Sequence, residues 1–212
     1  LKALCEEKGV LDIVYEESQI QVRKRTQSWP DDLLYLGVGN AWQLNPRQLA
    51  ALKILTPWRL HKARERDIPL GFIAKDGVLL ELARRMPKND DELSRIPDLA
   101  PMSRKYSGRD IIRCIQQAEQ VPESEFPQTL ERLDDMEGYK PTFKAIKKAV
   151  TELAESLHIP ASLVASRKQI NDFINFHWQY STQQQQRLPQ PDLMVGWRQH
   201  AIGAELQAII SK

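Results

Sequence analysis

Apolar residues recur at helical spacing along most of the chain, every third or fourth position, which predicts helices. The two longest apolar stripes are Leu49, Leu52, Leu55 and Trp58, and then Phe143, Ile146, Val150, Leu153 and Leu157. No segment alternates between apolar and polar residues for long enough to indicate a β-sheet. The pattern therefore predicts an all-α protein.

The two stripes belong to a repeat. Ile68-Pro69 and Ile159-Pro160 lie 91 positions apart, and the same offset pairs apolar residues on both sides of this break. The pairs are Leu52 with Phe143, Leu55 with Ile146, Ile73 with Val164, Leu79 with Ile170 and Leu82 with Phe173. A fixed offset through a helix, a break and a second helix indicates two copies of one helical module.

Polar residues at the ends of the stripes predict where helices begin. In the first copy, Asn45 precedes Pro46, as an N-cap precedes a proline in the first helical position. Three further helices are expected to be capped by Asp76, by Asn89 or Asp90, and by Ser107, the last of these running to Ala118. In the second copy, Ser166 and Gln169 have the spacing of a capping box, and the glutamine run 183–186 is interpreted as a loop.

The remaining segments predict the domain order. Residues 1–25 are expected to be helical with a break at Gly9, and 31–44 to form an apolar strap against the first module. The start lacks a signal-peptide pattern and an initiator Met, so we interpret the chain as an internal fragment. No apolar run reaches the roughly 20 residues that span a bilayer. The predicted divisions are 1–44, 45–118, 119–135 and 136–212, the third being an acidic linker.

Charge is unevenly distributed along the chain. The net charge of +2 divides into −2 for residues 1–44, +6 for 45–118, −5 for 119–135 and +3 for 136–212. Both copies of the module are therefore basic, and the segment between them is acidic. Basic modules attract polyanions such as nucleic acids, although many unrelated domains carry a charge of this size.

The sequence offers no strong catalytic or metal site. The four histidines lack partners at metal-binding spacing, and the two cysteines are far apart, as in reduced thiols. Asp134, Asp135 and Glu137 could bind a metal, but a solvated acidic end of the linker explains them better. Ser107 and Ser166 have capping roles and no base nearby in sequence. We therefore predict no catalytic residue, no metal ligand and no cofactor for this chain.

Candidate nucleic-acid-binding residues are basic. Four lysines, Lys140, Lys144, Lys147 and Lys148, gather on one flank of the predicted helix, away from its apolar stripe. Such a row fits a phosphate backbone without reading bases, and it also fits a solvated helix face. The first-copy candidates are Lys62, Arg66, Arg104 and Lys105. Arg59 is expected to be structural, and Trp58, Trp178 and Trp197 to anchor cores rather than stack on bases.

These residues resemble a known family. Residues 49–59, Asp67-Ile68-Pro69, Leu79–Ala83 and Met86-Pro87 are similar to the HRDC domain, named after helicase and RNase D C-terminal. The second copy, 136–212, is similar to the more divergent second HRDC domain of bacterial ribonuclease D. Residues 1–44 resemble the last helix of its exonuclease domain and a connector. The helicase version often has glycines where this chain has Ile96-Pro97-Asp98-Leu99-Ala100, so a phosphate contact there is disfavoured.

The resemblance implies two five-helix-type HRDC bundles that bind structured RNA, such as tRNA precursors. It implies a 3′–5′ exoribonuclease parent whose nuclease domain, outside this chain, uses Mg²⁺ or Mn²⁺. The fragment itself would be a monomeric, cytoplasmic binding region and not an enzyme. An alternative is that the modules are architectural, pack on the nuclease domain and control substrate access. A RecQ-like helicase tail is a weaker alternative, because that family normally has one such domain.

Overall fold

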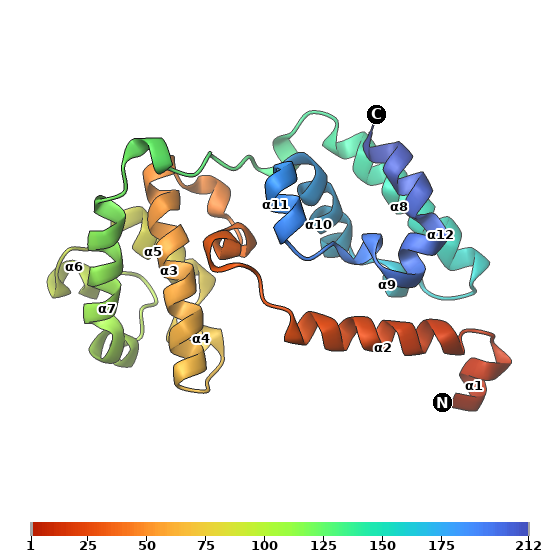
Figure 1. The fold of residues 1–212 in the computed structure, drawn as a ribbon, viewed down its shortest axis with the longest axis horizontal. Coiled ribbons are helices and arrows are strands. Elements are labelled where there is room, and N and C mark those ends of the chain that lie inside the picture. The colour runs from red at the N-terminus through yellow and green to blue at the C-terminus, as the bar shows by residue number, and fades with distance from the viewer. Residues whose placement is uncertain (1, 212) are drawn as a thin grey trace. The chain divides into compact units, whose positions relative to one another are not determined.

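The computed structural model describes residues 2–211, which form α-helices and 3-10 turns without a β-strand. The all-α prediction is confirmed for these residues. The chain divides into two compact units (Figure 1). We call Pro30–Arg132 the first unit, and Leu1–Trp29 together with Leu133–Lys212 the second unit. Each unit has its own hydrophobic core.

The first unit is built around one central helix. Its helices are α3 (Pro46–Glu65), α4 (Leu70–Ile73), α5 (Asp76–Arg85), α6 (Asp90–Ser94) and α7 (Pro101–Glu119). Its 3-10 turns are η1 (Asp31–Gly37), η2 (Ala41–Gln43) and η3 (Glu123–Glu125). Helix α3 contacts η1, α4, α5 and α7, and its Leu49, Leu52 and Leu55 are fully buried. The strap 31–44 adds Tyr35 and Leu44 to the same core.

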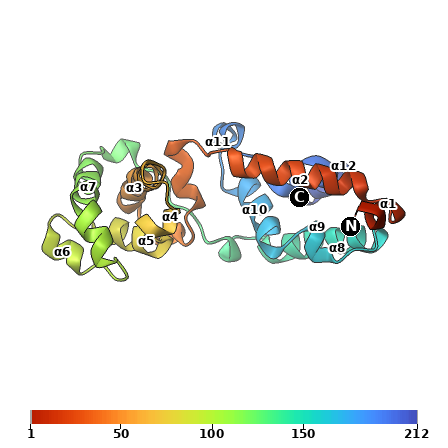
Figure 2. The ribbon, with the colours of Figure 1, turned by 90° about the horizontal axis from the view of Figure 1, so that it is seen from below.

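The second unit repeats this plan and adds an N-terminal helix. Its helices are α1 (Lys2–Glu7), α2 (Leu11–Thr26), α8 (Tyr139–Ser156), α9 (Ala161–Val164), α10 (Arg167–Trp178), α11 (Thr182–Arg187) and α12 (Gly196–Ile210). Its 3-10 turns are η4 (Leu133–Asp135) and η5 (Asp192–Met194). Helix α8 contacts α9, α10 and α12, and α12 also contacts α2 (Figure 2). Ile20 of α2 is buried in the core of this unit.

The repeat predicted from the sequence is confirmed in the backbone. Helices α4 and α9 begin 91 residues apart, and so do α5 and α10. The residues before the two Ile-Pro breaks, Asp67 and His158, both adopt left-handed backbone angles, with φ of 50° and 54°. The amides of Ile68 and Ile159 then donate to carbonyls five residues earlier, each at 3.0 Å. A left-handed residue that closes a helix in this way directs the chain into the next helix.

Three of the predicted helix starts are confirmed. Asn45 and Gln48 form a reciprocal capping box on α3, and Ser166 and Gln169 form one on α10. Of the two candidates for the start of α6, Asn89 is the cap, accepting a hydrogen bond from the amide of Glu92 at 2.9 Å. Each cap satisfies an amide that the first helical turn leaves unpaired.

The predicted start of the last helix of the first copy is wrong. Helix α7 begins at Pro101, and Ser107 and Gly108 are buried in its interior. A Cβ atom on Gly108 would lie 3.1 Å from Cδ2 of Leu93, so the small residues allow α7 to approach α6. Proline in the first helical position has no amide to satisfy and is preset for the helix. Ser107 therefore serves packing and is not a cap.

Two other local predictions are corrected. Asp76 is the first helical residue of α5 rather than its cap, and its carboxylate instead accepts a hydrogen bond from Arg59 at 2.7 Å. The glutamine run 183–186 is not a loop, because it lies within helix α11. Ser181 and Gln184 form a capping box that starts this helix.

Candidate nucleic-acid interface

The four candidate lysines of the second copy share one exposed face of α8. Lys140, Lys144, Lys147 and Lys148 are all exposed. The opposite face of the helix buries Ile146, Ala149 and Val150 in the core of the second unit. Tyr139 at the start of the helix is also buried, and its hydroxyl donates to Asn171 of α10 at 3.0 Å. The apolar stripe therefore fixes which way the lysines face.

These lysines are largely free to bind an anion. Among residues 2–211, only Lys148 of this row has an ion pair, with exposed Glu152 at 3.5 Å. An exposed pair of this kind contributes at most about 1 kcal/mol, so a phosphate can replace the carboxylate. Positions four apart on a helix differ by about 6 Å along its axis. Long lysine side chains at this interval can contact several phosphates of one backbone.

Of the four candidate RNA-binding residues in the first copy, two lie close to acidic side chains and two remain exposed. Lys62 is only 19% exposed and bonds Glu65 at 3.0 Å and Asp110 at 3.5 Å. The hydrogen bond to Glu65, together with the charge of Asp110, raises the Lys62 pKa. Arg104 is half-buried and lies 3.8 Å from Asp90. Lys62 therefore joins α3 to α7, whereas Arg66 and Lys105 remain exposed.

Arg66 and Lys105 flank an aromatic residue that the sequence analysis missed. The guanidinium carbon of Arg66 and the Nζ atom of Lys105 each lie 5.8 Å from the centre of the Tyr106 ring. Arg66 also donates to the Tyr106 carbonyl at 3.4 Å. One turn later, Arg109 is exposed as well. The spacing of four between Lys105 and Arg109 would have placed both on one helix face around Tyr106. It was missed because the helix was predicted to start at Ser107, after Lys105.

The residues expected to be structural are structural. Arg59 donates to the carbonyl of Ala74 at 3.0 Å and to Asp76. Trp197 is buried in the core of the second unit, while Trp58 and Trp178 pack against the cores of their own units. None of these tryptophans forms an exposed platform for a base.

A buried ion pair fixes α2 on the second unit. Arg198 is 3% exposed, and it donates to the carbonyls of Val164 at 2.6 Å and Leu163 at 3.1 Å and to the carboxylate of Glu17. The indole of Trp197 also donates to Glu17, at 3.1 Å. Burial favours the neutral carboxyl, but hydrogen bonds from Arg198 and other donors outweigh it and lower the Glu17 pKa. One arginine thus joins α2, α9 and α12.

The lowered Glu17 pKa predicts a pH dependence of stability. Because the folded-state pKa lies below the unfolded value near 4.5, the ion pair stabilises the fold fully above that value. This stabilisation is lost as the pH falls through the folded-state pKa. We expect Glu17→Gln to lower the melting temperature at pH 7, and the difference from the unmodified chain to shrink towards pH 3. Thermal melts across this range measure it, and parallel curves would contradict it.

Two family models match the chain, one on each copy. The HRDC domain model matches residues 48–115, and the model described as Ribonuclease D, C-terminal HRDC domain, matches residues 137–206. Both copies are HRDC domains, and they match the C-terminal half of ribonuclease D.

The chain is similar to ribonuclease D from several bacteria. It is 37% identical over 204 residues to that of Cronobacter turicensis, covering 96% of this chain and 54% of the relative. It is 36% identical over 208 residues to that of Escherichia coli, covering 98% and 54%. The crystal structure of E. coli RNase D, described as an exoribonuclease involved in structured RNA processing, matches with a TM-score of 0.79 and 34% identity over 97% of this chain and 54% of that one. The chain thus spans about half the length of these relatives.

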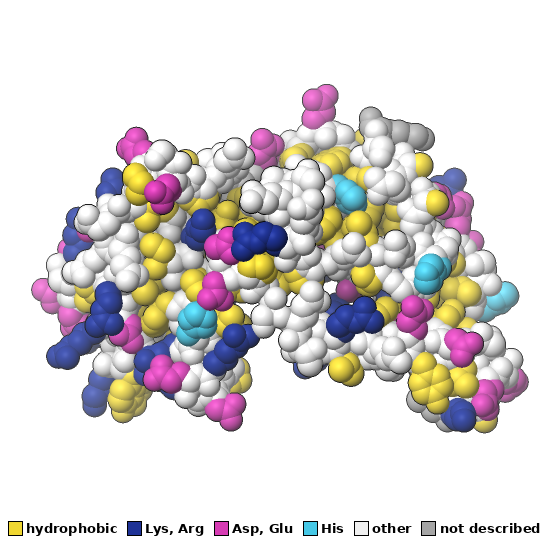
Figure 3. Space-filling view, in the orientation of Figure 1, with side chains coloured by type: hydrophobic (Ala, Val, Ile, Leu, Met, Phe, Trp, Pro, Cys, Tyr) yellow, Lys and Arg dark blue, Asp and Glu magenta, His cyan; other side chains and the backbone are white. Residues whose placement is uncertain are grey.

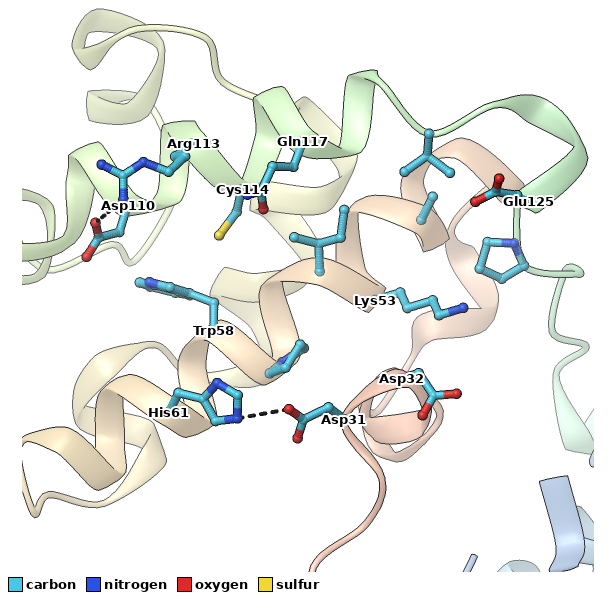
Figure 4. A pocket seen from close by; sticks show the side chains of 15 residues that line it. Asp31, Asp32, Lys53, Trp58, His61, Asp110, Arg113, Cys114, Gln117 and Glu125 are labelled. Atoms are coloured by element: carbon cyan, nitrogen blue, oxygen red, sulfur yellow. Dashed lines mark hydrogen bonds and ion pairs between the residues drawn. The ribbon is translucent and has the colours of Figure 1, made fainter. Parts of the chain in front are cut away.

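The first HRDC domain also has a pocket, of about 680 Å³, between η1, α3, α7 and residues 121–127 (Figure 4). None of the candidate RNA-binding residues lines it. Its charges are mixed, with His61 paired to Asp31 at 2.9 Å. Burial, with a contribution from Asp110, raises the pKa of Cys114 to about 11, so this thiol is protonated at neutral pH. The buried indole N–H of Trp58, which also lines the pocket, has no hydrogen-bond partner.

Two kinds of feature are absent from residues 2–211. No group of three or more His, Cys, Asp or Glu side chains is placed to hold a metal ion. None of the helices described there is long and apolar enough to cross a membrane.

Proposed function

We propose that the two HRDC domains hold structured RNA, such as a tRNA precursor, for 3′-end trimming by the nuclease domain of a ribonuclease D. The observation that carries this proposal is the exposed lysine row on α8, three of whose four members have no ion-pair partner among residues 2–211. The description of the E. coli relative as an enzyme of structured RNA processing supports the substrate class. The nuclease domain would supply the divalent metal, Mg²⁺ or Mn²⁺, and the chemistry.

Binding through this row should be electrostatic. Each phosphate neutralised releases condensed counterions, so affinity falls as a power of the salt concentration. With four contacts the logarithmic slope is about −3.6 on a duplex, which corresponds to roughly 100-fold between 50 and 200 mM salt. Contacts to the backbone alone select the shape of an RNA helix rather than its base sequence.

Charge reversal on α8 tests the proposal. We expect Lys144→Glu combined with Lys148→Glu to weaken binding to a tRNA precursor about tenfold or more at 50 mM salt and to reduce the salt slope by about two. Fluorescence anisotropy over a salt series measures both quantities. Circular dichroism should show unchanged helix content, since both lysines are exposed.

The matched control is a second double variant that changes the net charge by the same amount but lies away from α8. Lys2→Glu with Lys8→Glu alters two exposed lysines in the α1 region and should lower affinity only slightly. Equal losses for the two double variants would show non-specific attraction rather than a site on α8. No detectable binding at low salt would refute the proposal.

The contacts of α2 favour the architectural alternative as a second candidate. While Ile20 and Glu17 face the second unit, Tyr15 and Val22 of the same helix are 54% and 65% exposed. A helix with an apolar residue every seventh position on its free side is typical of one that packs against a further domain. In this alternative the HRDC domains shape access to the nuclease site. It would gain support if the chain bound no RNA although its fold was intact.

A further inference from the structure

The exposed face of α7 in the first HRDC domain has an unusual composition. Its exposed residues after Pro101 are Met102, Lys105, Tyr106, Arg109, Arg113, Gln116 and Gln117. This face contains three cations, an aromatic ring and no acidic residue. Asp110 of the same helix is only 29% exposed and is engaged by Lys62 at 3.5 Å and Arg113 at 3.4 Å.

Tyr106 is the centre of this face. Its side chain is 57% exposed. Arg66 and Lys105 approach the ring from α3 and α7 and leave much of it open to solvent. Among residues 2–211 neither cation has an ion pair. An exposed ring between two unpaired cations offers a surface on which a base can stack and two positive charges that can bind phosphates.

A second apolar surface lies at the same end of the domain. The left-handed turn at Asp67 leads directly into α4, which contacts α7. Phe72 on α4 is 75% exposed. Figure 1 shows the end of α3, helix α4 and the start of α7 gathered at one end of this unit. On that end, yellow hydrophobic side chains lie on the surface among dark-blue cations and magenta acidic side chains (Figure 3).

We propose that Tyr106, with Arg66 and Lys105 beside it, is a stacking platform for unpaired nucleotides of an RNA strand. This proposal rests on the proposed function. It adds that the two HRDC domains bind different parts of the RNA. The lysine row on α8 has no exposed aromatic residue, since Tyr139 is buried and Phe143 half-buried, and it therefore suits the backbone of a duplex. The α7 face suits a single-stranded segment, because every unpaired base can stack on an aromatic ring.

The charge of the face argues for RNA as the ligand. A protein partner for an apolar patch would be bound mainly by buried area, and Arg66 and Lys105, which have no ion pair among residues 2–211, would then be desolvated without compensation. A nucleic-acid strand supplies one phosphate per base, so it satisfies the cations while its base covers the ring. The cations and the exposed ring together therefore suit a single strand of RNA, which has a phosphate and a base in every nucleotide.

Tyrosine substitution with two RNA probes tests this. The probes are a 12-nucleotide oligoadenylate and a blunt RNA hairpin whose strands are joined by a hexaethylene glycol linker, so that it has no unpaired nucleotide. Each is fluorescein-labelled and measured against the 212-residue chain at 50 mM salt. Stacking contributes about 1–3 kcal/mol per base, so Tyr106→Leu should weaken oligoadenylate binding roughly 5- to 150-fold. Hairpin binding should change less than twofold. Tyr106→Phe keeps the ring and should keep both affinities.

The control is Tyr15→Leu, which removes the similarly exposed tyrosine of α2 and should change neither affinity. A photocrosslink from 4-thiouridine in the single-stranded probe, mapped by mass spectrometry, should fall on Tyr106 or Phe72. If Tyr106→Leu leaves oligoadenylate binding unchanged, or weakens hairpin binding equally, the platform is refuted while the proposed function stands. If the chain binds neither probe, both proposals fail.

Discussion

Replacing Arg198 with methionine is expected to lower the free energy of unfolding of the second unit by about 3 kcal/mol, the lower end of the cost of breaking a buried ion pair. Methionine keeps much of the arginine stem but leaves the Glu17 carboxylate and the carbonyls of Leu163 and Val164 without this donor. The Glu17 side chain is 28% exposed, so water can recover part of the loss. Urea denaturation followed by circular dichroism measures the change.

The matched control for this substitution is Arg167→Met. The Arg167 side chain is 73% exposed and lies 3.9 Å from Asp134, so its replacement should change stability by less than about 0.5 kcal/mol. Hydrogen exchange should also report faster exchange in α2 for Arg198→Met only, because Arg198 joins that helix to α9 and α12. A variant as stable as the unmodified chain would show that Ile20 and its apolar neighbours hold α2, with the ion pair setting only its register.

Local rules predicted much of this fold from the sequence. The caps at Asn45 and Ser166 were found because a cap depends on residues three positions apart. The repeat was found because burial is periodic: Leu55 and Ile146 are paired by the offset of 91, and both are fully buried. A two-residue Ile-Pro signal located both helix breaks, since proline restricts the residue before it.

The errors at the starts of α7 and α11 arose because one local signal was followed and a neighbouring one was overlooked. Ser107 has the local appearance of a cap, but Pro101 starts α7 six residues earlier, and Gly108 in the helix interior lies against Leu93 of α6. The glutamine run of α11 appeared to be low-complexity, and its capping serine lies just outside it, at Ser181.

The candidate site was predicted only as far as charge and periodicity define it. The helical wheel placed the lysines of α8 on one face, and the structure leaves them exposed there. It could not show that Lys62 is held by Asp110, 48 residues later, or that Arg66 reaches Tyr106 from another helix. The ion pair of Glu17 with Arg198 links positions 181 residues apart. No local pattern contains such pairs, because they depend on how helices pack.

The repeat makes a second prediction of large effect. Leu55→Ala and Ile146→Ala remove equivalent side chains, one from the core of each unit, and both side chains are 0% exposed. We expect each substitution to lower the free energy of unfolding of its own unit by about 2–5 kcal/mol, through lost burial and the cavity left behind. Peptide-resolved hydrogen exchange separates the two units, since the slowest amides of each report its own opening.

A second equivalent pair provides the control, because the same offset also joins two exposed residues. Phe72 on α4 and Leu163 on α9 are 75% and 60% exposed, so Phe72→Ala and Leu163→Ala should each change stability by less than about 0.5 kcal/mol. All four substitutions remove a large apolar side chain at a repeat-equivalent position, and only burial differs between the pairs. If the exposed pair proved as destabilising as the buried pair, the equivalence of the two modules would fail at the level of packing, and the offset of 91 would describe the backbone alone.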